Sequence, residues 1–342
     1  MTLASKKNGK QTVKIESPVS IAATAAIVGP KEGDGPLRLY FDMIIDDELW
    51  GEKSWEKAES KIVKETFSRL LSKADKTTGD IDYVIAGDLL NQCIAANFGL
   101  RDSEIPFFGV FGACSTIAES MQLGTMLIDG GYADNVVALT SSHFCSAEKQ
   151  FRFPLELGTQ RPPTSQWTVT GSGAVLLTNQ GSGPYITYLT TGKIVDMGIK
   201  DSNNMGAAMA PAAVDTIATH FKDTGLPIDY YDLIVTGDLG LVGKTICADL
   251  LKRHGFDISD RYNDCGVMIF DCKRQDVHSG GSGCACSATV FTGFIYHEIM
   301  KGNLNRVLFV PTGALMSTTS TQQGESIPAI AHAVSVERVL SS

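Results

Sequence analysis

The chain alternates short apolar runs with longer segments in which apolar residues return every three or four positions. The clearest helical pattern covers residues 54–74, where Ala58, Ile62 and Phe67 share one side and Ser54 can cap the first turn. The short apolar runs are typical of buried strands. In the first half they lie at residues 13–28, 81–86, 107–110, 135–140 and 175–178. Helical segments between such strands predict βαβ units and a parallel or mixed sheet covered on both faces.

The second half repeats this pattern. Asp-Tyr-Val-Ile-Ala-Gly-Asp-Leu at residues 82–89 is echoed by Asp-Leu-Ile-Val-Thr-Gly-Asp-Leu at residues 232–239. Ala-Cys-Ser at residues 113–115 recurs at residues 285–287, and a helix-length segment follows each copy. Two matches in the same order indicate a duplicated unit.

The turn Gly-Ser-Gly-Pro before residue 185 marks the boundary between the two copies. We therefore expect two halves, residues 1–184 and residues 185–342. The first half carries Cys114, and the second half carries its repeat partner Cys286.

Charge and cysteine usage narrow the class of protein. The formal net charge is -9 and no basic block is present, which disfavours sequence-independent binding to nucleic acid or to an anionic membrane. The eight cysteines are scattered, as is typical of a reduced compartment. No apolar stretch has the ~20 residues that span a membrane, and the polar start lacks the apolar region of a signal peptide. Any membrane association is therefore expected to be peripheral.

Cys114 is the first candidate for chemistry. It stands between an apolar run and a helical segment predicted at residues 115–128, which would place its sulfur near a helix N-terminus. Such a position favours a thiolate or a bound anion. The alternative is a small buried cysteine at a strand-to-helix junction.

Two other motifs match known binding motifs only in part. Gly237 to Thr245 invites comparison with a phosphate-binding loop, but Asp238 occupies the position of the first glycine of that motif. Cys284 and Cys286 could hold a soft metal, but a structural zinc site needs four ligands and no second pair is nearby. We expect neither a nucleotide nor a structural metal.

A cationic, aromatic-walled pocket is predicted after the strand at residues 135–140. His143, Lys149 and Arg152 follow that strand, and Arg161 and Trp167 come shortly afterwards. Groups just beyond strand ends line the crevice where α/β proteins bind ligands. These residue types suit a flat carboxylate. The alternative is a surface loop with ordinary solvated charges.

The internal repeat, Cys114 and the Gly-Ser-Gly-Ala turn at residues 171–174 resemble the thiolase-type fold. The resemblance implies an α/β, thiolase-like protein whose duplicated βαβαβ halves form a layered α-β-α-β-α structure. Active condensing enzymes place a histidine after a second-half strand, where this chain has residues 236–240, and a histidine or asparagine in the loop at residues 280–284. Neither segment contains such a residue, so carbon–carbon condensation is not expected.

Three longer motifs are similar to the stage V sporulation protein AD family of spore-forming bacilli. They are Gly-Ala-Cys-Ser-Thr-Ile-Ala-Glu-Ser (112–120), Ser-Ser-His-Phe-Cys-Ser-Ala-Glu-Lys-Gln-Phe-Arg (141–152) and His-Ser-Gly-Gly-Ser-Gly-Cys (278–284). The resemblance implies non-catalytic binding of dipicolinic acid (pyridine-2,6-dicarboxylate) and its calcium chelate, for uptake into the developing spore. The implied partners are membrane-embedded stage V sporulation proteins of the same operon, with a homodimer as a further possibility. Calcium is expected only as part of the bound chelate, with no other cofactor.

This hypothesis assigns roles to individual residues. The backbone N–H groups of Cys114 and Ser115 would receive one carboxylate, Arg152 or Lys149 would pair with the other, and His143 or Trp167 would meet the ring. Ser282 would donate from the opposite half, and the chelated calcium would complete its shell with water, Glu148 or Asp238. The predicted ligand-binding residues are Cys114, Ser115, His143, Glu148, Lys149, Arg152, Trp167, Asp238, Ser282 and Cys284.

Two alternatives stay open at this point. The first is an acyltransferase that uses Cys114 as nucleophile with His143 or His278 as an unusual base. The second is a vestigial pocket in a protein that serves mainly as an assembly subunit of a membrane complex.

Overall fold

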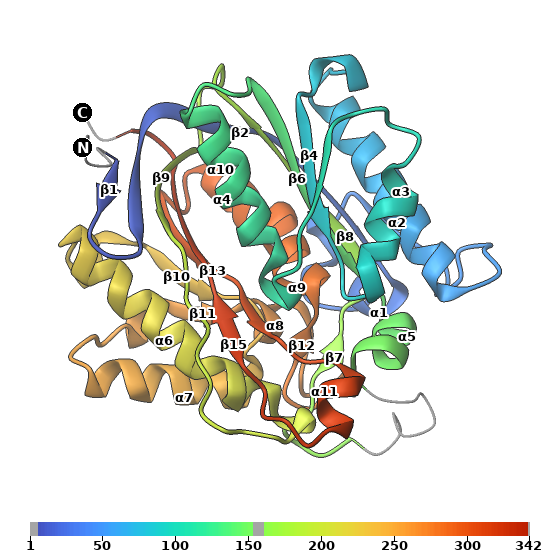
Figure 1. Cartoon of the computed structure of the whole chain (residues 1–342), viewed down its shortest axis with the longest axis vertical. Helices are drawn as coiled ribbons and strands as arrows, with labels where there is room; N and C mark the ends of the chain where they lie inside the picture. Colours follow the sequence, from blue (N-terminus) through green and yellow to red (C-terminus); the bar gives the residue numbers. More distant parts are fainter. Residues whose placement is uncertain (1–5, 153–160, 341–342) are drawn as a thin grey trace.

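The computed structural model describes residues 6–152 and 161–340 (Figure 1). Its strands form a 12-stranded mixed sheet in the order β11-β10-β13-β16-β9-β2-β8-β6-β4-β5, with β1 and β3 also paired to β2. The first-half strands are β2 (Thr12–Val28), β4 (Tyr83–Gly87), β5 (Phe107–Gly109), β6 (Asn135–Ser142) and β8 (Gly171–Thr178). The second-half strands are β9 (Tyr185–Thr190), β10 (Leu233–Thr236), β11 (Tyr262–Asp264), β13 (Arg306–Val310) and β16 (Ala333–Glu337).

The two groups of strands have the same topology. In each group the sheet order is first, fifth, fourth, second, third strand of the group. The directions also match: β4 is parallel to β5 and β6, as β10 is to β11 and β13, and the remaining pairs are antiparallel. This repeated order agrees with a duplicated unit, although the exact boundary after residue 184 stays a prediction.

Strand β2 connects the two groups. Residues from Thr12 to Ser20 pair with β9, and residues from Ser20 to Val28 pair with β8. One strand therefore belongs to both halves.

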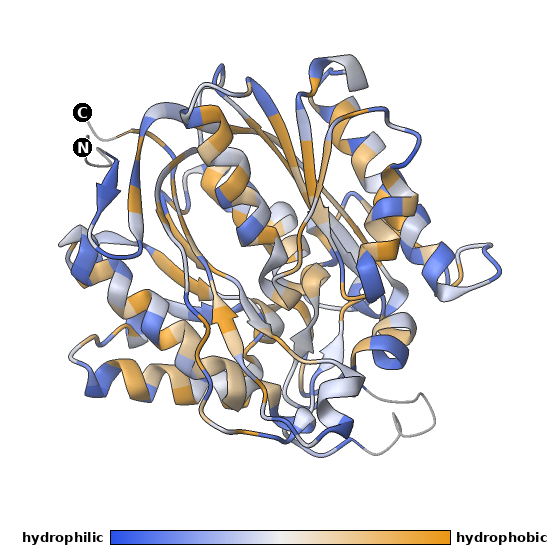
Figure 2. Ribbon diagram, viewed as in Figure 1, coloured by the Kyte–Doolittle hydropathy of each residue, from blue (hydrophilic) through white to orange (hydrophobic). Residues whose placement is uncertain are grey.

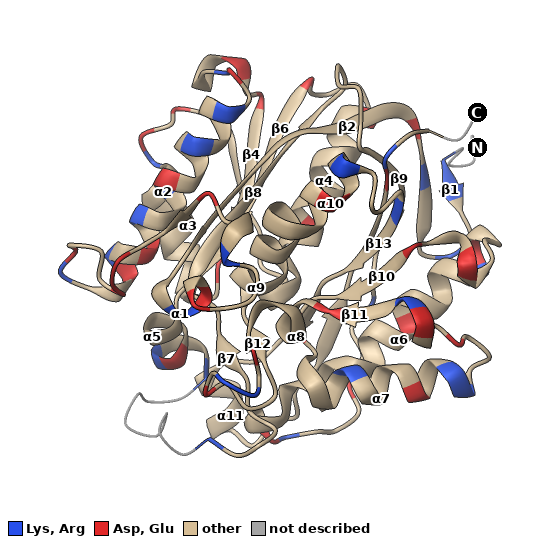
Figure 3. Ribbon diagram, turned by 180° about the vertical axis from the view of Figure 1, so that it is seen from behind, with Lys and Arg blue, Asp and Glu red and all other residues tan. Residues whose placement is uncertain are grey.

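Helices form layers on and between these strands. The outer helices of the first half are α2 (Trp55–Lys73) and α3 (Ile94–Leu100), and those of the second half are α6 (Met205–Thr224) and α7 (Gly240–Arg253). Helices α4 (Thr116–Asp129) and α9 (Cys284–Thr289) lie between the two groups of strands (Figure 1). Hydrophobic residues line the strands (Figure 2), while Lys, Arg, Asp and Glu gather on the outer helices (Figure 3). The predicted layered α/β architecture is confirmed.

Shorter elements complete the chain. The remaining strands are β1 (Lys7–Asn8), β3 (Met43–Ile44), β7 (Trp167–Thr168), β12 (Gly281–Ser282), β14 (Thr312–Ala314) and β15 (Ala329–Ala331). The remaining helices are α1 (Pro30–Gly33), α5 (Phe144–Ala147), α8 (Cys265–Ile269), α10 (Tyr296–Lys301), α11 (Thr318–Gln322) and the π-helical turns η5 (Glu148–Arg152) and η10 (Val290–Ile295). Within the described residues, no helix is both long and apolar enough to cross a membrane.

Close packing explains the Gly-Ser-Gly-Ala turn at the start of β8. A Cβ atom on Gly173 would lie 2.7 Å from the backbone carbon of Ala288 in α9. Such a contact is well inside van der Waals distance, so the backbone of the central helix can approach this strand only because the residue is glycine.

Two helix boundaries differ from the sequence prediction because buried aspartates cap the backbone. The sequence at residues 89–98 predicts one helix, but this segment contains left-handed residues at Gln92 and Cys93, and α3 begins only at Ile94. Asp88 accepts hydrogen bonds from the backbone N–H groups of Leu90 and Ala96, at 2.8 Å each, and so stabilises this irregular start.

The sequence at residues 244–254 predicts a second helix, but α7 begins earlier, at Gly240, because Asp264 accepts from the N–H groups of Leu239 and Gly240, at 2.9 Å each. The Asp264 carboxyl accepts hydrogen bonds from backbone N–H groups that a phosphate-binding loop would offer to a phosphate. The Asp264 carboxyl therefore occupies these N–H groups of the loop that resembles a phosphate-binding motif.

Candidate functional site

Cys114 lies where the two halves meet. It belongs to the short helical turn Ala113–Ser115 before α4, and the turn starts from a left-handed Ala113 with a φ of 49°. The side chain is buried. Its sulfur lies 3.9 Å from the hydroxyl oxygen of Ser282, which comes from β12 in the second half.

The Ser282 hydroxyl is hydrogen-bonded to a buried carboxyl group. Ser282 Oγ donates to Asp238 Oδ2 at 2.8 Å, and Thr312 Oγ1 donates to Asp238 Oδ1 at 2.6 Å. The backbone N–H of Gly283 also points to Oδ2, at 3.3 Å. Both carboxyl oxygens therefore accept hydrogen bonds from the protein. Thr312 is a member of this cluster that the sequence reasoning missed.

The sulfur of Cys114 is held as a neutral thiol. Burial raises the pKa of Cys114 well above its usual value, and the nearby Asp238 carboxyl raises it further. Of the two interpretations of Cys114, the structure therefore favours the small buried cysteine over the thiolate, because loss of solvation disfavours the charged form.

Ser115 is also unavailable in its predicted role. Its backbone N–H donates to the carbonyl oxygen of Gly112 at 3.1 Å, and its hydroxyl donates to the same oxygen at 2.6 Å. The turn before α4 satisfies these donors locally, so Ser115 does not present them to a ligand carboxylate.

Gln166 links this cluster to the segment before β7. Its Nε2 donates to the backbone oxygens of Asp238 and Gly281, at 2.5 and 2.9 Å. Its Oε1 is buried and has no hydrogen-bond partner among the described residues. The sequence reasoning did not single out Gln166, because only the pairing of β7 with β12 brings it to residues more than seventy positions away.

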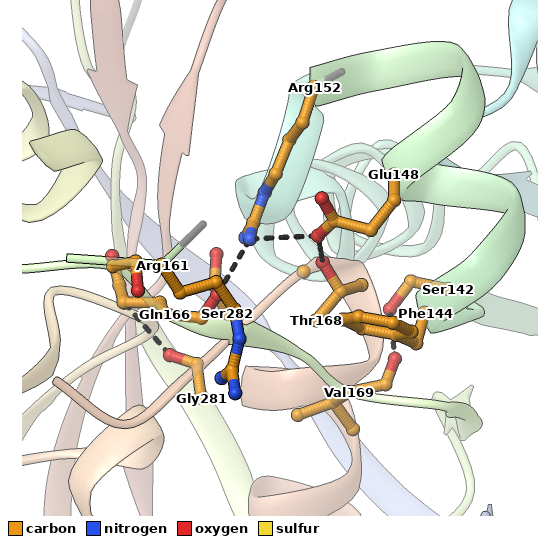
Figure 4. Close-up of polar contacts among 12 residues, drawn as sticks. Ser142, Phe144, Glu148, Arg152, Arg161, Gln166, Thr168, Val169, Gly281 and Ser282 are labelled. Atoms are coloured by element: carbon orange, nitrogen blue, oxygen red, sulfur yellow. Dashed lines mark hydrogen bonds and ion pairs between the residues drawn. The ribbon is translucent and has the colours of Figure 1, made fainter. Parts of the chain in front are cut away.

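Arg152 extends the network (Figure 4). Its Nη1 donates to Glu148 Oε1 at 3.1 Å and to the backbone oxygen of Gln166 at 2.7 Å. The hydroxyl of Thr168 lies 3.5 Å from the same Glu148 oxygen. The Arg152 side chain is only 7% exposed, and within the described part of the chain its Nε has no partner. Hydrogen bonds thus lead from Arg152 through Gln166 to Asp238 and Ser282, beside Cys114.

An aromatic and cationic cluster lies next to Arg152. The ring of Phe144 stacks on Trp167 with a centroid separation of 3.8 Å (Figure 4 shows Phe144). Lys31 Nζ lies 3.8 Å from the centroid of the Trp167 ring, and the guanidinium carbon of Arg161 lies 5.0 Å from it. Because Phe144 covers one face of Trp167, these cations lie over the other. Burial and the charge of Arg161 lower the pKa of Lys31.

Comparison with known proteins decides the family. Residues 9–337 match the family model described as Stage V sporulation protein AD (SpoVAD). The chain is 48% identical over 333 residues to the Stage V sporulation protein AD of Bacillus subtilis (strain 168), covering 97% of this chain and 98% of that protein. The chain belongs to the stage V sporulation protein AD family. Membership in this family assigns it to sporulation.

Solved structures show the wider fold. The 3-oxoacyl-[acyl-carrier-protein] synthase III of Aquifex aeolicus VF5 superposes with a TM-score of 0.56 at 11% identity, covering 93% of this chain and 99% of that one. Cerulenin-bound OleA of Xanthomonas campestris gives a TM-score of 0.58 at 15% identity, covering 94% and 97%. At these identities the likeness shows that the sporulation family shares the thiolase-like fold, and no more.

Two residues predicted for the pocket lie elsewhere in this family member. His143 is buried, with Nε2 donating to the backbone oxygen of Glu48 at 2.7 Å and Nδ1 accepting from the N–H of Cys145 at 3.2 Å. Lys149 is 54% exposed and pairs with Glu56 at 3.0 Å. Neither side chain is linked to the Cys114 network by the hydrogen bonds of the described residues.

The other histidine considered as a base also has its own partner. His278 Nε2 lies 3.4 Å from a carboxylate oxygen of Asp276. Cys284, also predicted to bind ligand, donates its thiol proton to the backbone oxygen of Ala113 at 3.0 Å and is buried. Its role is to hold the turn that carries Cys114. Among the described residues, no group of three His, Cys, Asp or Glu side chains is arranged to hold a metal ion.

Proposed function

We propose that this sporulation protein binds pyridine-2,6-dicarboxylate and its calcium chelate, without catalysis, for uptake into the developing spore. The observation that carries the proposal is Arg152, a nearly buried guanidinium whose Nε–H has no partner among the described residues. A buried donor without an acceptor is costly, and a charged one is especially so. A ligand carboxylate would satisfy it with a charge-assisted hydrogen bond.

The neighbouring groups suit a flat dianion. Glu148 neutralises part of the Arg152 charge. Lys31 and Arg161 both lie over the Trp167 ring, so their positive charges repel each other. A second carboxylate would relieve that repulsion and place its ring near an aromatic side chain. Asp276 pairs with Arg161 and supplies one negative charge there, which leaves Lys31 without an ion-pair partner within the described residues. In this proposal Arg152 keeps its predicted role, while Ser115, His143 and Lys149 lose theirs. Trp167 meets the ligand only at its edge, because Phe144 and the two cations occupy its faces.

Calorimetric titration of the purified protein with the dicarboxylate tests the assignment. Arg152→Ala is expected to weaken binding at least about tenfold, since a hydrogen bond to a charged group is worth about 1.5–3 kcal/mol. Lys149→Ala is the matched control, because Lys149 lies on the same turn but points to Glu56. Equal affinity in the wild type and Arg152→Ala, or no binding by the wild type at millimolar concentration, would reject the proposal.

Acyl transfer is the rival function, and one contact favours it: the sulfur of Cys114 lies beside a hydroxyl that is hydrogen-bonded to a buried carboxyl. Such a chain could accept a proton. However, burial and the nearby Asp238 carboxyl raise the pKa of Cys114 well above its usual value, so its thiol does not readily give up its proton here. Incubation with acyl thioesters and intact-mass measurement separates the two functions. A covalent adduct that disappears in Cys114→Ala would establish the enzyme.

The partner proteins are also a proposal. We expect peripheral association with membrane-embedded stage V sporulation proteins at the inner membrane of the developing spore. A homodimer is expected through β5, the edge strand of the sheet, which carries the exposed Phe107 and Phe108. If the protein is mainly an assembly subunit, Arg152→Ala will retain function in sporulating cells while surface substitutions abolish it.

A further inference from the structure

Glu59 is a fully buried carboxyl group without a cationic partner. It lies on α2 and has no exposed surface. Ser141 Oγ, from β6, donates to its Oε1 at 2.9 Å, and Ser146 Oγ, from α5, donates to its Oε2 at 2.8 Å. No ion pair between described residues includes Glu59. One buried side chain therefore joins α2 to both β6 and α5.

The groups that face Glu59 disfavour a negative charge on it. Asp88, which follows β4, and Glu56, on α2 itself, are acidic, and the thiol of Cys284 in α9 is buried. Burial lowers the pKa of His143, the N-cap of α5, so this ring offers no positive charge at neutral pH. Burial, together with the charge of Asp88, raises the pKa of Glu59 to about 8 from the usual 4.5.

The protonated form of Glu59 suits this environment, and the ionised form does not. Because hydroxyl groups rotate, a neutral Glu59 can donate its proton to one of its two serine partners and accept from the other. An ionised Glu59 is a buried charge without a counter-ion, which is costly. Asp88 differs because two backbone N–H groups donate to it and stabilise its negative charge. Of the two facing carboxyl groups, Asp88 therefore carries the charge and Glu59 keeps the proton.

Two carboxyl groups of α2 hold the helical turn that carries Arg152. This turn consists of α5 and η5, and we call it the α5–η5 turn. Glu59 is hydrogen-bonded to Ser146 near its start, and Glu56 pairs with Lys149 in its second part at 3.0 Å. Arg152 is the last residue of the turn (Figure 4). The position of the Arg152 guanidinium therefore depends on how the turn packs against α2.

We propose that Glu59 holds the α5–η5 turn against α2 only while it carries its proton, and that loss of the proton releases the turn. In the released form water reaches the carboxylate, whose pKa then returns to the ordinary 4.5 from about 8. The closed form binds the proton more tightly, so it loses stability relative to the open form as pH rises between these two values. The ratio of closed to open protein should fall by up to about tenfold per pH unit in that range and stay constant above it.

Release of the turn does not depend on which ligand the protein binds. The consequence for binding does rest on the proposed function. An open turn withdraws the Arg152 guanidinium from the position in which it would receive a carboxylate. The affinity for the ligand is therefore expected to fall as pH rises, which makes the site sensitive to the pH of its compartment.

Hydrogen exchange of the free protein from pH 5 to pH 8, followed by mass spectrometry, tests the release itself. After correction for the intrinsic pH dependence of exchange, opening of the α5–η5 amides should increase by about threefold to tenfold per pH unit in the wild type. Glu59→Gln keeps the shape and the hydrogen bonds of the neutral acid but cannot ionise, so its opening should not depend on pH.

Glu56→Gln is the matched control, because Glu56 also holds the turn. Burial would raise the pKa of Glu56, but the hydrogen bond from Lys149 outweighs burial and the pKa is lowered, so Glu56 stays ionised over this range. This variant should exchange faster at every pH and keep the wild-type slope. Equal slopes in the wild type and Glu59→Gln would overturn the inference. Wild-type exchange that is independent of pH would do so as well, even if Glu59→Gln does not fold.

Calorimetry with pyridine-2,6-dicarboxylate at pH 6 and pH 8 tests the consequence for binding. Carboxylic acids are ionised at both values, so the charge of this probe stays the same. Wild-type affinity should be at least about threefold lower at pH 8, and Glu59→Gln should lose less than half of that factor. Burial and Arg161 lower the pKa of Lys31, but this group titrates alike in both proteins. Binding with the same pH dependence in both would reject control by Glu59 and leave the binding function intact. Absence of binding at both pH values would reject the binding function, while the exchange result decides the release of the turn.

Discussion

The two halves use the same aspartate position for different purposes. Asp88 and Asp238 each follow the second strand of their half in an identical Gly-Asp-Leu sequence. Asp88 caps backbone N–H groups of its own half, at Leu90 and Ala96. Asp238 instead accepts from Ser282 and Thr312 beside Cys114.

The difference depends on Asp264. In the second half this residue, at the end of the neighbouring strand β11, caps Leu239 and Gly240 and so performs the task that Asp88 performs in the first. Asp238 is thereby released to face the junction between the halves. The two halves therefore place the same aspartate in different roles, with Asp264 capping the backbone in the second half. Four substitutions test this account.

The largest effect is expected from Asp264→Ala. The substitution leaves two buried backbone N–H groups without their acceptor. It also removes the shortest hydrogen bond of the Thr236 hydroxyl, which keeps Tyr262 and Asn263 as partners. At about 1–3 kcal/mol for each unsatisfied group, we expect unfolding to become easier by about 4 kcal/mol. Urea denaturation measures the change, and a loss below about 1 kcal/mol would contradict the capping role.

Asp88→Ala is expected to cause the second-largest loss of stability. It removes the acceptor of two buried N–H groups rather than three donors, so we expect a loss of about 3 kcal/mol by the same measurement. Ligand affinity should stay at the wild-type value, because Asp88 contacts only its own half through these bonds. A loss of binding without a loss of stability would mean that the two aspartates are not functionally distinct.

Stability should also depend on pH through Asp264. Burial raises the pKa of this carboxyl to about 7, from the usual 3.8. Between these values the unfolded chain has released a proton that the folded chain keeps, so the free energy of unfolding falls as pH rises. From about pH 5 to about pH 7 the fall due to this group is expected to be about 2 kcal/mol.

Asp264→Asn provides the comparison for that measurement. Glu32 and Glu59, whose pKa values burial raises to about 8, give the same sign in both proteins. The difference in slope between wild type and variant therefore isolates Asp264. Parallel stability curves would show that Asp264 does not titrate in this range.

The smallest change in stability is expected from Asp238→Asn. The asparagine can still accept from Ser282 or Thr312, whose hydroxyls rotate to suit it, so a loss of about 1 kcal/mol or less is expected. A loss of stability as large as that of Asp264→Ala would mean that Asp238 has a mainly structural role. The proposed difference between the two halves would then be wrong. Its effect on ligand affinity can be read in the same titrations as Arg152→Ala.

Much of the fold could be predicted because it follows from short-range patterns. Apolar runs gave the strands, the repeat of Gly-Asp-Leu and Ala-Cys-Ser indicated duplication, and Ser54 caps α2 as expected, accepting from Lys57 at 3.3 Å. The helix starts controlled by Asp88 and Asp264 were misplaced, because a side chain from a loop or a neighbouring strand decides them.

The site was predicted only in part. Arg152, Trp167, Asp238 and Ser282 do gather around the junction, but Gln166 and Thr312 were missed. Their roles depend on strand pairing between distant segments, which local sequence does not encode. The choice between a thiolate and a buried cysteine at Cys114 could not be made for a similar reason: the helix N-terminus is visible in the sequence, whereas complete burial is not.

Strand β2 has a consequence for how a ligand enters. Many two-lobed binding proteins close on their ligand by a hinge rotation, which needs lobes joined by flexible crossings. Here the hydrogen bonds of one continuous strand run into the sheets of both lobes, at β9 and β8. A rigid rotation of the lobes would break that ladder. If the proposed binding function holds, we therefore expect the ligand to enter and leave through local rearrangement of loops around a fixed frame.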